Sequence, residues 1–210
     1  MDVVSDIVCP WCFIGKRRLE RAAVILGNAI DIRWHPFQLN PRIPVEGVSR
    51  REYRIGKFGS WEYSQQLDAR VAENGRAVGI EFRHDLMART PNSFHGHVLL
   101  AAALRQGGVE LQNRVAERLF LGYFTKGEDV GDADVLARIA RECSVFGVLD
   151  NPGLDADVIT EETNARDSGV QGVPLITFQG HLVSEGAAPE EMLAVRLKEL
   201  SEESRGENAD

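Results

Sequence analysis

The chain has 210 residues, of which 43% are hydrophobic and 27% are charged, a balance that excludes wholesale disorder. Lys and Arg number 24 against 32 Asp and Glu, and the resulting net charge of −8 argues against nucleic acid as a partner. We expect no membrane segment, because no apolar run reaches the roughly 18 residues that a spanning helix needs. We expect a cytoplasmic protein, because three cysteines are too few for a disulfide framework and the amino terminus lacks the basic and apolar segments of a secretory signal.

The first forty residues predict a strand, a helix and a second strand. Residues 2–6 are short and β-branched, as in a strand. The helix ends at Gly27, and its buried face is formed by apolar residues at helical spacing: Leu19, Ala22, Ala23 and Leu26. Residues 30–39 alternate in polarity and predict the second strand. A helix that joins two neighbouring strands makes them parallel.

The middle of the chain changes to helical signals after a proline-rich exit over residues 40–47. Ser49 is expected to cap the first of these helices, with Glu52 completing a capping box. Thr90 and Pro91 match the first two positions of a helix start. Further helices are predicted over residues 61–74, 91–106 and 110–125. Asp132 is expected to cap a helix that ends near residue 143, and Asp155 or Asp157 one that ends near residue 168. Residues 79–82 predict a short extended piece.

Strand signals return near the end of the chain. Residues 173–178 and 181–184 predict two strands joined by a turn at residues 179–180, and a last helix runs from Pro189 to about residue 200. This order of elements predicts an α/β protein with a thioredoxin-like fold and a large α-helical insertion. In this division residues 1–41 and 169–204 form one discontinuous thioredoxin-like domain, residues 42–168 form the inserted helical domain, and residues 205–210 are a frayed tail.

The segment Cys9-Pro10-Trp11-Cys12 carries the chemistry that we expect. A zinc half-site would need two more ligands at suitable spacing, and Cys143 is the only spare thiol. The motif instead follows a strand and opens a helix, with Cys9 at the N-cap and Pro10 at the first helical position. Backbone N–H groups and the helix dipole there favour a thiolate at Cys9. Cys9 is therefore expected to attack a disulfide, and the less exposed Cys12 to resolve the intermediate.

Residues around the motif have roles that the sequence leaves open. Trp11 is expected on the surface beside the sulfur, in contact with substrate. Asp6 is either a buried proton relay for Cys12 or a turn residue. Lys16 and the two arginines after it are expected on a solvated helix face. Pro174 opens a strand where it removes a ladder donor, and together with the cysteine motif it favours a cis peptide bond.

These segments resemble the FrnE-type branch of the DsbA-like thiol–disulfide oxidoreductases, which belong to the thioredoxin superfamily. The similar segments are residues 6–16, residues 34–41, Thr90-Pro91-Asn92 with His97, Leu119-Phe120 with Tyr123-Phe124, and residues 169–174. The resemblance implies thiol–disulfide exchange or isomerisation on proteins, with a redox-active disulfide in place of a cofactor and no metal. The implied partners are proteins with thiols or disulfides, with glutathione as a candidate co-substrate, and the chain would act as a monomer or a homodimer.

The resemblance also implies which residues bind substrate. In such folds the loop before Pro174 faces the cysteine motif, and the backbone of Val173 pairs with the substrate chain. His97 would line the cleft above Cys9, although a satisfied helix histidine is the plainer interpretation. Asn92 would face the same cleft or, more simply, cap a helix.

Two other functions stay open. The superfamily includes 2-hydroxychromene-2-carboxylate isomerases and kappa-class glutathione transferases, which use glutathione on small aromatic compounds and typically carry serine where Cys9 stands. A Cys9–Cys12 pair favours the redox branch over this alternative. The other alternative is a non-catalytic binding module, in which the two thiols hold a metal or staple the helix.

Overall fold

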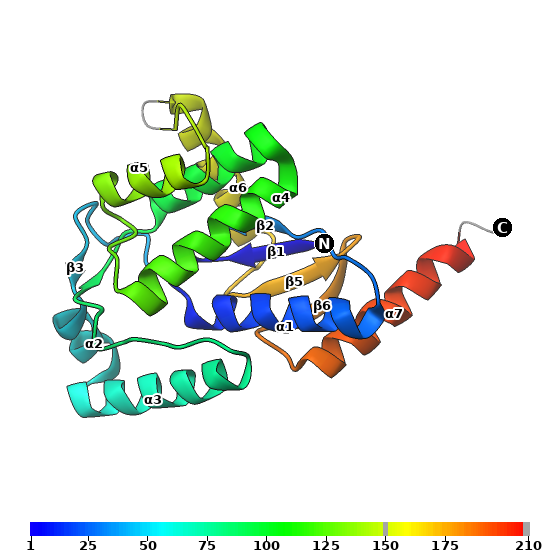
Figure 1. The fold of residues 1–210 in the computed structure, drawn as a ribbon, viewed down its shortest axis with the longest axis horizontal. Coiled ribbons are helices and arrows are strands. Elements are labelled where there is room, and N and C mark those ends of the chain that lie inside the picture. Colours follow the sequence, from blue (N-terminus) through cyan, green and yellow to red (C-terminus); the bar gives the residue numbers. More distant parts are fainter. Residues whose placement is uncertain (149–150, 208–210) are drawn as a thin grey trace.

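The computed structural model describes residues 1–148 and 151–207, which fold around a four-stranded sheet. The strand order is β2 (Arg33–Pro36), β1 (Asp2–Ser5), β5 (Leu175–Phe178) and β6 (His181–Glu185). β1 pairs in parallel with β2 and antiparallel with β5, which forms a hairpin with β6. The first strand therefore joins segments from both ends of the chain (Figure 1).

Helices from the two ends of the chain cover this sheet. α1 (Pro10–Leu26) packs along α7 (Glu190–Glu207), and Figure 1 shows the pair in front of the strands. Between β2 and β5 in the sequence lie the remaining described elements: β3 (Val48–Ser49), α2 (Arg50–Phe58), α3 (Trp61–Ala77), β4 (Arg89–Thr90), α4 (Phe94–Lys126), α5 (Ala133–Glu142) and α6 (Pro152–Asp167). The expected thioredoxin-like fold with a helical insertion is confirmed. Across the two described ranges, no helix combines the length and the apolar character needed to cross a bilayer.

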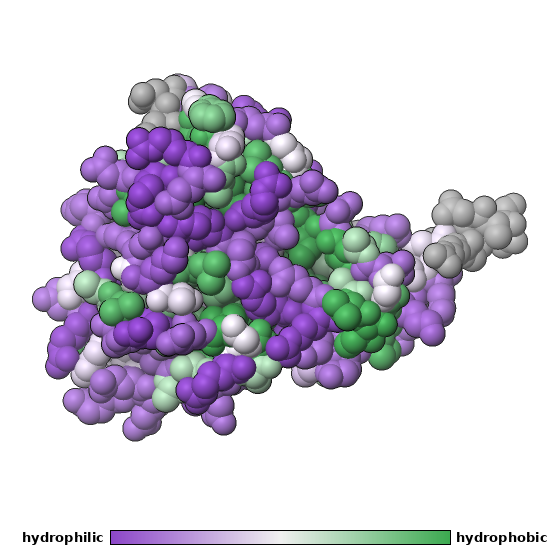
Figure 2. All heavy atoms as spheres, viewed as in Figure 1, coloured by the Kyte–Doolittle hydropathy of each residue, from purple (hydrophilic) through white to green (hydrophobic). Residues whose placement is uncertain are grey.

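Exposed apolar residues gather at the carboxyl end of α1. Val24 and Ile25 are 81% and 55% exposed. Figure 2 shows apolar surface in this region, bordered by polar residues. This end of α1 is opposite to the end that carries the cysteine motif, so the apolar surface is not part of the site around Cys9.

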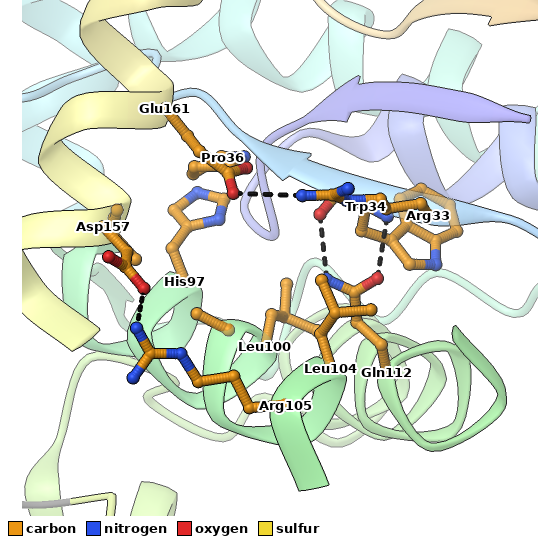
Figure 3. Close-up of a pocket in the computed structure, with 12 residues that line it drawn as sticks. Arg33, Trp34, Pro36, His97, Leu100, Leu104, Arg105, Gln112, Asp157 and Glu161 are labelled. Atoms are coloured by element: carbon orange, nitrogen blue, oxygen red, sulfur yellow. Dashed lines mark hydrogen bonds and ion pairs between the residues drawn. The ribbon is translucent and has the colours of Figure 1, made fainter. Parts of the chain in front are cut away.

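The outer edge of β2 is closed by a side chain of α4. Gln112 is buried, accepts a hydrogen bond from the backbone N–H of Trp34 and donates one to the carbonyl of the same residue, both at 2.9 Å. The amide group takes the place of a neighbouring strand, because it offers one donor and one acceptor side by side. This contact, drawn in Figure 3, attaches α4 to the sheet.

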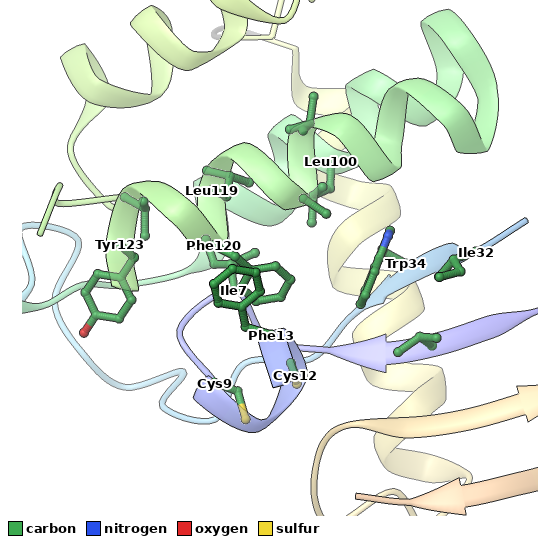
Figure 4. Close-up of a cluster of buried hydrophobic side chains, with 14 of the residues drawn as sticks. Ile7, Cys9, Cys12, Phe13, Ile32, Trp34, Leu100, Leu119, Phe120 and Tyr123 are labelled. Atoms are coloured by element: carbon green, nitrogen blue, oxygen red, sulfur yellow. The ribbon is translucent and has the colours of Figure 1, made fainter. Parts of the chain in front are cut away.

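The core next to the cysteine motif consists of stacked aromatic rings. Phe13 of α1 lies 5.2 Å from Phe120 of α4 between ring centroids, with the planes 7° apart, and both side chains are buried. Tyr123 and Phe124, one turn further along α4, are buried as well. Figure 4 shows Phe13 and Phe120 directly above the first turn of α1. Because Phe13 follows Cys12 in the sequence, this packing fixes the position of the motif.

α4 begins later than the sequence predicts. The expected start at residues 90–91 is wrong, because Thr90 pairs with Val48 between β4 and β3 and the first helical residue is Phe94. The side chain of Asn92 accepts a hydrogen bond from the N–H of Phe94 at 2.9 Å. The N-cap position is therefore Ser93, three residues later than the local pattern indicates, and the Asn92 side chain satisfies the first helical N–H.

Several other boundaries differ from the predictions. The predicted break after residue 106 is present as a kink inside α4, where Gly108 has φ of +66°. α6 begins at Pro152 with Asn151 as its N-cap, so the predicted caps at 155 and 157 are wrong. Residues 79–82, which are all described, form no strand. The tail predicted for residues 205–210 is helical as far as Glu207, and residues 208–210 lie outside the described residues.

Candidate active site

Cys9 occupies the N-cap of α1, as its place in the sequence predicts. Its backbone is extended, with φ of −93° and ψ of 115°, and its carbonyl accepts hydrogen bonds from the N–H groups of Cys12 at 3.1 Å and Phe13 at 3.4 Å. Pro10 takes the first helical position, where it has no N–H to leave unpaired. The N–H of Cys9 donates to the Asp6 carbonyl at 3.0 Å, so the turn after β1 determines where the helix starts.

The Cys9 thiol contacts the loop before β5. The expected hydrogen bonds from first-turn N–H groups to the sulfur do not form at this helix end. That expectation is wrong because the sulfur turns toward the Val173 carbonyl, to which the thiol donates at 3.7 Å. The peptide bond between Val173 and Pro174 is cis, as the sequence predicts. The fold thus brings together two segments that lie 164 residues apart.

Cys12 lies in the first turn of α1 and is completely buried, whereas Cys9 is 4% exposed. Both thiols are free. Burial raises the pKa of Cys12 well above its usual value, and the adjacent Cys9 sulfur raises it further, while the Ser5 side chain and the Asp6 backbone oppose the change. Figure 4 shows both thiols at the amino end of α1, with the Cys9 sulfur directed away from the aromatic cluster. The raised pKa favours the protonated form of the Cys12 thiol.

Asp6 is a fully buried carboxylate in the turn between β1 and α1. It accepts hydrogen bonds from the N–H groups of Leu39 at 2.7 Å and Val8 at 3.3 Å. Its Oδ1 also lies 3.4 Å from Nε2 of His97, an atom that has no hydrogen-bond partner in the described part of the chain. Asp6 therefore ties the turn before Cys9 to the segment that follows β2.

A cavity of about 400 Å³ opens beside Cys9. Pro10 and Trp11 line it on the side of the motif, and Trp11 is 37% exposed. The opposite wall is formed by α2, α3 and the carboxyl end of α4, which Figure 1 shows around the amino end of α1. Aromatic rings contribute much of this wall, among them those of Tyr53 and Phe58. Cys9 is nearly buried, and it lines this cavity.

His97 and Asn92 do not line the cavity beside Cys9. His97 is buried and lines a second cavity, of about 160 Å³, between β2, α4 and α6 (Figure 3). Asn92 accepts from the N–H of Phe94 and donates to the Ile43 carbonyl at 2.6 Å. At these positions Asn92 acts as a cap and His97 as a buried helix residue next to Asp6.

The wall of the cavity beside Cys9 also carries charged residues that the sequence patterns do not single out. Arg50 and Arg54 of α2 each form an ion pair with Asp68 of α3 at 2.7 Å. Lys57 and Arg70 line the same wall. The only signal in the sequence is the basic character of α2, and a charged helix face is usually solvated. The packing of α2 on α3 is what turns these cations toward the cavity.

The basic residues of α1 are paired instead of solvated. Lys16 is 3% exposed and forms an ion pair with Glu117 at 2.9 Å and another with Glu20. Arg17 pairs with the same two carboxylates. The expected solvated face is wrong for these two residues, because α4 supplies Glu117 opposite them. Their charge is therefore compensated locally.

Cys143 lies apart from both cavities. It is the C-cap of α5 and is partly buried, and burial raises the pKa of its thiol. It lines neither the cavity beside Cys9 nor the one at His97. Over residues 1–148 and 151–207, no three His, Cys, Asp or Glu side chains are grouped as a metal site requires.

Known proteins are similar to the chain over most of its length. An uncharacterized protein of Bacillus subtilis, YwbO, is 26% identical over 219 residues, which cover 98% of this chain and 97% of that protein. A probable DsbA oxidoreductase from Streptomyces coelicolor has a TM-score of 0.81 and 26% identity, covering 94% of this chain and 88% of that one. A cytosolic disulfide reductase, DsbM from Pseudomonas aeruginosa with GSH, has a TM-score of 0.65 and 18% identity, covering 95% and 98%. The family described as DSBA-like thioredoxin domain matches residues 1–198, and the chain, with its cysteine motif set against a cis-proline loop, belongs to that family.

Proposed function

We propose that the chain is a thiol–disulfide oxidoreductase or isomerase of the FrnE-type branch, which exchanges disulfides with protein substrates through Cys9 and Cys12. The observation that carries the proposal is the pair of adjacent thiols at the amino end of α1, opposite the Val173 carbonyl. The backbone before Pro174 offers hydrogen-bonding groups to a substrate strand next to the reacting sulfur. Trp11, exposed beside the motif, contacts the side chains of that substrate.

The exchange proceeds in two balanced steps. The Cys9 thiolate attacks one sulfur of a substrate disulfide, the substrate S–S bond breaks, and the leaving sulfur takes up a proton. Cys12 then loses its proton and attacks the Cys9 sulfur of the mixed disulfide. The second substrate thiol leaves, and Cys9 and Cys12 form a disulfide. Two electrons pass from the protein dithiol to the substrate, and the reverse sequence donates a disulfide.

Asp6 is the proposed acceptor of the Cys12 proton. The buried Cys12 needs a base close by, and the backbone of Asp6 already contacts its thiol. The carboxylate of Asp6 is fully buried in the turn between β1 and α1. Its hydrogen bonds to Leu39 and Val8 hold it in place during the exchange.

The proposed partners are proteins with thiols or disulfides, and glutathione as a small co-substrate. The similar reductase from Pseudomonas aeruginosa was solved with GSH. The two sulfurs carry the electrons, so the proposed reaction uses no metal or prosthetic group. We place the chain in the cytoplasm, where paired cysteines in a chain with few others are usually catalytic. It would act as a monomer or a homodimer.

Trapping of the mixed disulfide tests this function. Cys12→Ser protein, mixed with disulfide-bonded insulin, should form a covalent adduct through Cys9 that mass spectrometry detects and dithiothreitol releases. Cys9→Ser should form no adduct at the motif, and Cys143→Ser should behave like the wild type, because its thiol lies apart from the cavity. Absence of an adduct with Cys12→Ser, together with no insulin reduction by the wild type, would contradict the proposal.

The cavity beside Cys9 also suits a glutathione-dependent isomerase or transferase that acts on a small aromatic compound. Its volume of about 400 Å³ and its partly aromatic wall are typical of small-molecule sites. The two functions differ in their need for Cys12. An isomerase or transferase keeps its activity in Cys12→Ser, whereas repeated disulfide exchange needs both thiols.

A further inference from the structure

We propose that the cavity beside Cys9 selects disulfides that carry a carboxylate close to the reacting sulfur, and that Arg54, Lys57 and Arg70 form the cationic wall that selects them. This inference rests on the proposed thiol–disulfide exchange and adds the chemical class of the preferred substrate. It applies to small disulfides and to the acidic side chains that flank a disulfide in a protein.

The charge of the cavity is opposite to that of the whole chain. Arg50, Arg54, Lys57 and Arg70 line it, and Asp68 is the only carboxylate among the described residues that do so. The complete chain has a net charge of −8. The composition of an acidic protein does not predict a cluster of cations around one cavity. The cluster beside Cys9 is suited to a negatively charged ligand.

The single carboxylate cannot neutralise this wall. Arg50 and Arg54 share Asp68, each at 2.7 Å, so one negative charge serves two positive ones. Lys57 donates to the Tyr53 hydroxyl at 2.9 Å. In the described part of the chain neither Lys57 nor Arg70 has an ion-pair partner. Positive charge is therefore left over, and a substrate carboxylate would supply the missing partner.

Two titratable groups in the wall are poorly solvated. Burial is the main cause that lowers the pKa of Arg54; Asp68 opposes this change, and the neighbouring Arg50 adds to it. Burial is also the main cause that lowers the pKa of His84, where Asp68 again opposes and Arg50 and Arg54 add to the effect. Charges in this wall are therefore only partly screened by water.

Cys9 lies at the border of this wall. The residue is 4% exposed, its thiol donates to the Val173 carbonyl, and it lines the cavity together with the cations. A substituent two carbons from a sulfur that reacts with Cys9 is therefore expected to enter the cavity. A carboxylate there is attracted by the unpaired cations, whereas an ammonium group is repelled by them.

Three disulfides of equal length test the proposal: 3,3′-dithiodipropionate, 2-hydroxyethyl disulfide and cystamine, whose two-carbon arms end in a carboxylate, a hydroxyl and an ammonium group. Pre-reduced protein supplies the two electrons, so each reaction yields the Cys9–Cys12 disulfide and two small thiols. The single-turnover rate is measured by stopped-flow tryptophan fluorescence and divided by the rate of the same disulfide with dithiothreitol. We expect the normalised rate to be at least about tenfold higher for the carboxylate than for the ammonium disulfide, with the hydroxyl between them. Added salt should reduce this ratio.

The double variant Lys57→Gln/Arg70→Gln should lower the ratio of carboxylate to ammonium rates by about tenfold, and both side chains are exposed enough for the variant to fold. Arg51→Gln is the matched control, because Arg51 is on the same helix but lies over the Trp61 ring outside the cavity lining. Its ratio should equal that of the wild type. Equal normalised rates for the three disulfides would contradict the selection by charge. So would a fall of the ratio in Arg51→Gln as large as that in the double variant. Either result would leave the proposed thiol–disulfide function intact. If none of the disulfides reacts, the thiol–disulfide function itself fails.

Discussion

Replacing Asp6 with alanine should destabilise the protein strongly, because its carboxylate satisfies two buried N–H groups. These groups belong to Leu39, at 2.7 Å, and Val8, at 3.3 Å. Hydrogen bonds to a charged group contribute about 1.5–3 kcal/mol each, which gives about 3–6 kcal/mol for the pair. The longer bond to Val8 places the expected loss in the lower half of this range, about 3–4 kcal/mol, with a fall in Tm of about 6–16 °C. Asp6→Asn keeps one acceptor oxygen and should lose about half as much.

Urea unfolding followed by circular dichroism measures the free energy, and hydrogen exchange of the Leu39 amide shows whether the loss is local to this contact. Asp85→Ala is the control for removing one negative charge, because this carboxylate is exposed and, within the described ranges, its only ion-pair partner is Arg83. Its unfolding midpoint should match that of the wild type. A loss below about 1 kcal/mol in Asp6→Ala, with unchanged protection of the Leu39 amide, would refute the reasoning.

Two further predictions concern the sheet and the core. Burial opposes protonation of His35, but its hydrogen bonds to Glu161 and Asp2 outweigh this and raise its pKa. The stability that His35 contributes should therefore be fully present below about pH 6.5, its unfolded pKa, and be lost as the pH rises through the higher folded-state pKa. The difference in unfolding free energy between wild type and His35→Gln should shrink from pH 5.5 to 8.5, and a constant difference would contradict the assignment. Phe13→Ala should lower the unfolding free energy by about 3–5 kcal/mol in the same urea assay, and a loss under about 1 kcal/mol would show that the aromatic stack does not support the motif.

The features that sequence alone predicted are those that depend on short spacings. The helical repeat of α1, the N-cap position of Cys9 and the capping of α2 by Ser49 are each decided within one or two turns. The cis peptide bond before Pro174 was also predictable, but only because the cysteine motif was considered together with the proline that opens the strand. Local chemistry is sufficient for such features, since their hydrogen bonds close within a few residues.

The features that sequence missed depend on contacts between distant segments. Thr90 has the local pattern of a helix cap, but pairing with Val48 holds it in a strand. Lys16 has the pattern of a solvated residue, but Glu117 of a distant helix buries and pairs it. The cationic wall opposite Cys9 forms only when α2 packs on α3, and no periodicity in α2 indicates which partner will cover it. Tertiary packing decided each of these positions against local preference.

The sheet places side by side segments that the ribosome synthesises far apart in time, because β1 pairs with β5. The carbonyl that contacts the Cys9 thiol belongs to Val173, which is synthesised 164 residues after Cys9. At about 5–20 residues per second, the nascent chain carries an uncovered reactive thiol for roughly 8–33 s. Throughout that interval, oxidants and low-molecular-weight thiols can reach Cys9, because the Val173 loop has not yet packed against it. The nascent chain is therefore most exposed to premature oxidation at the residue that we propose for the exchange.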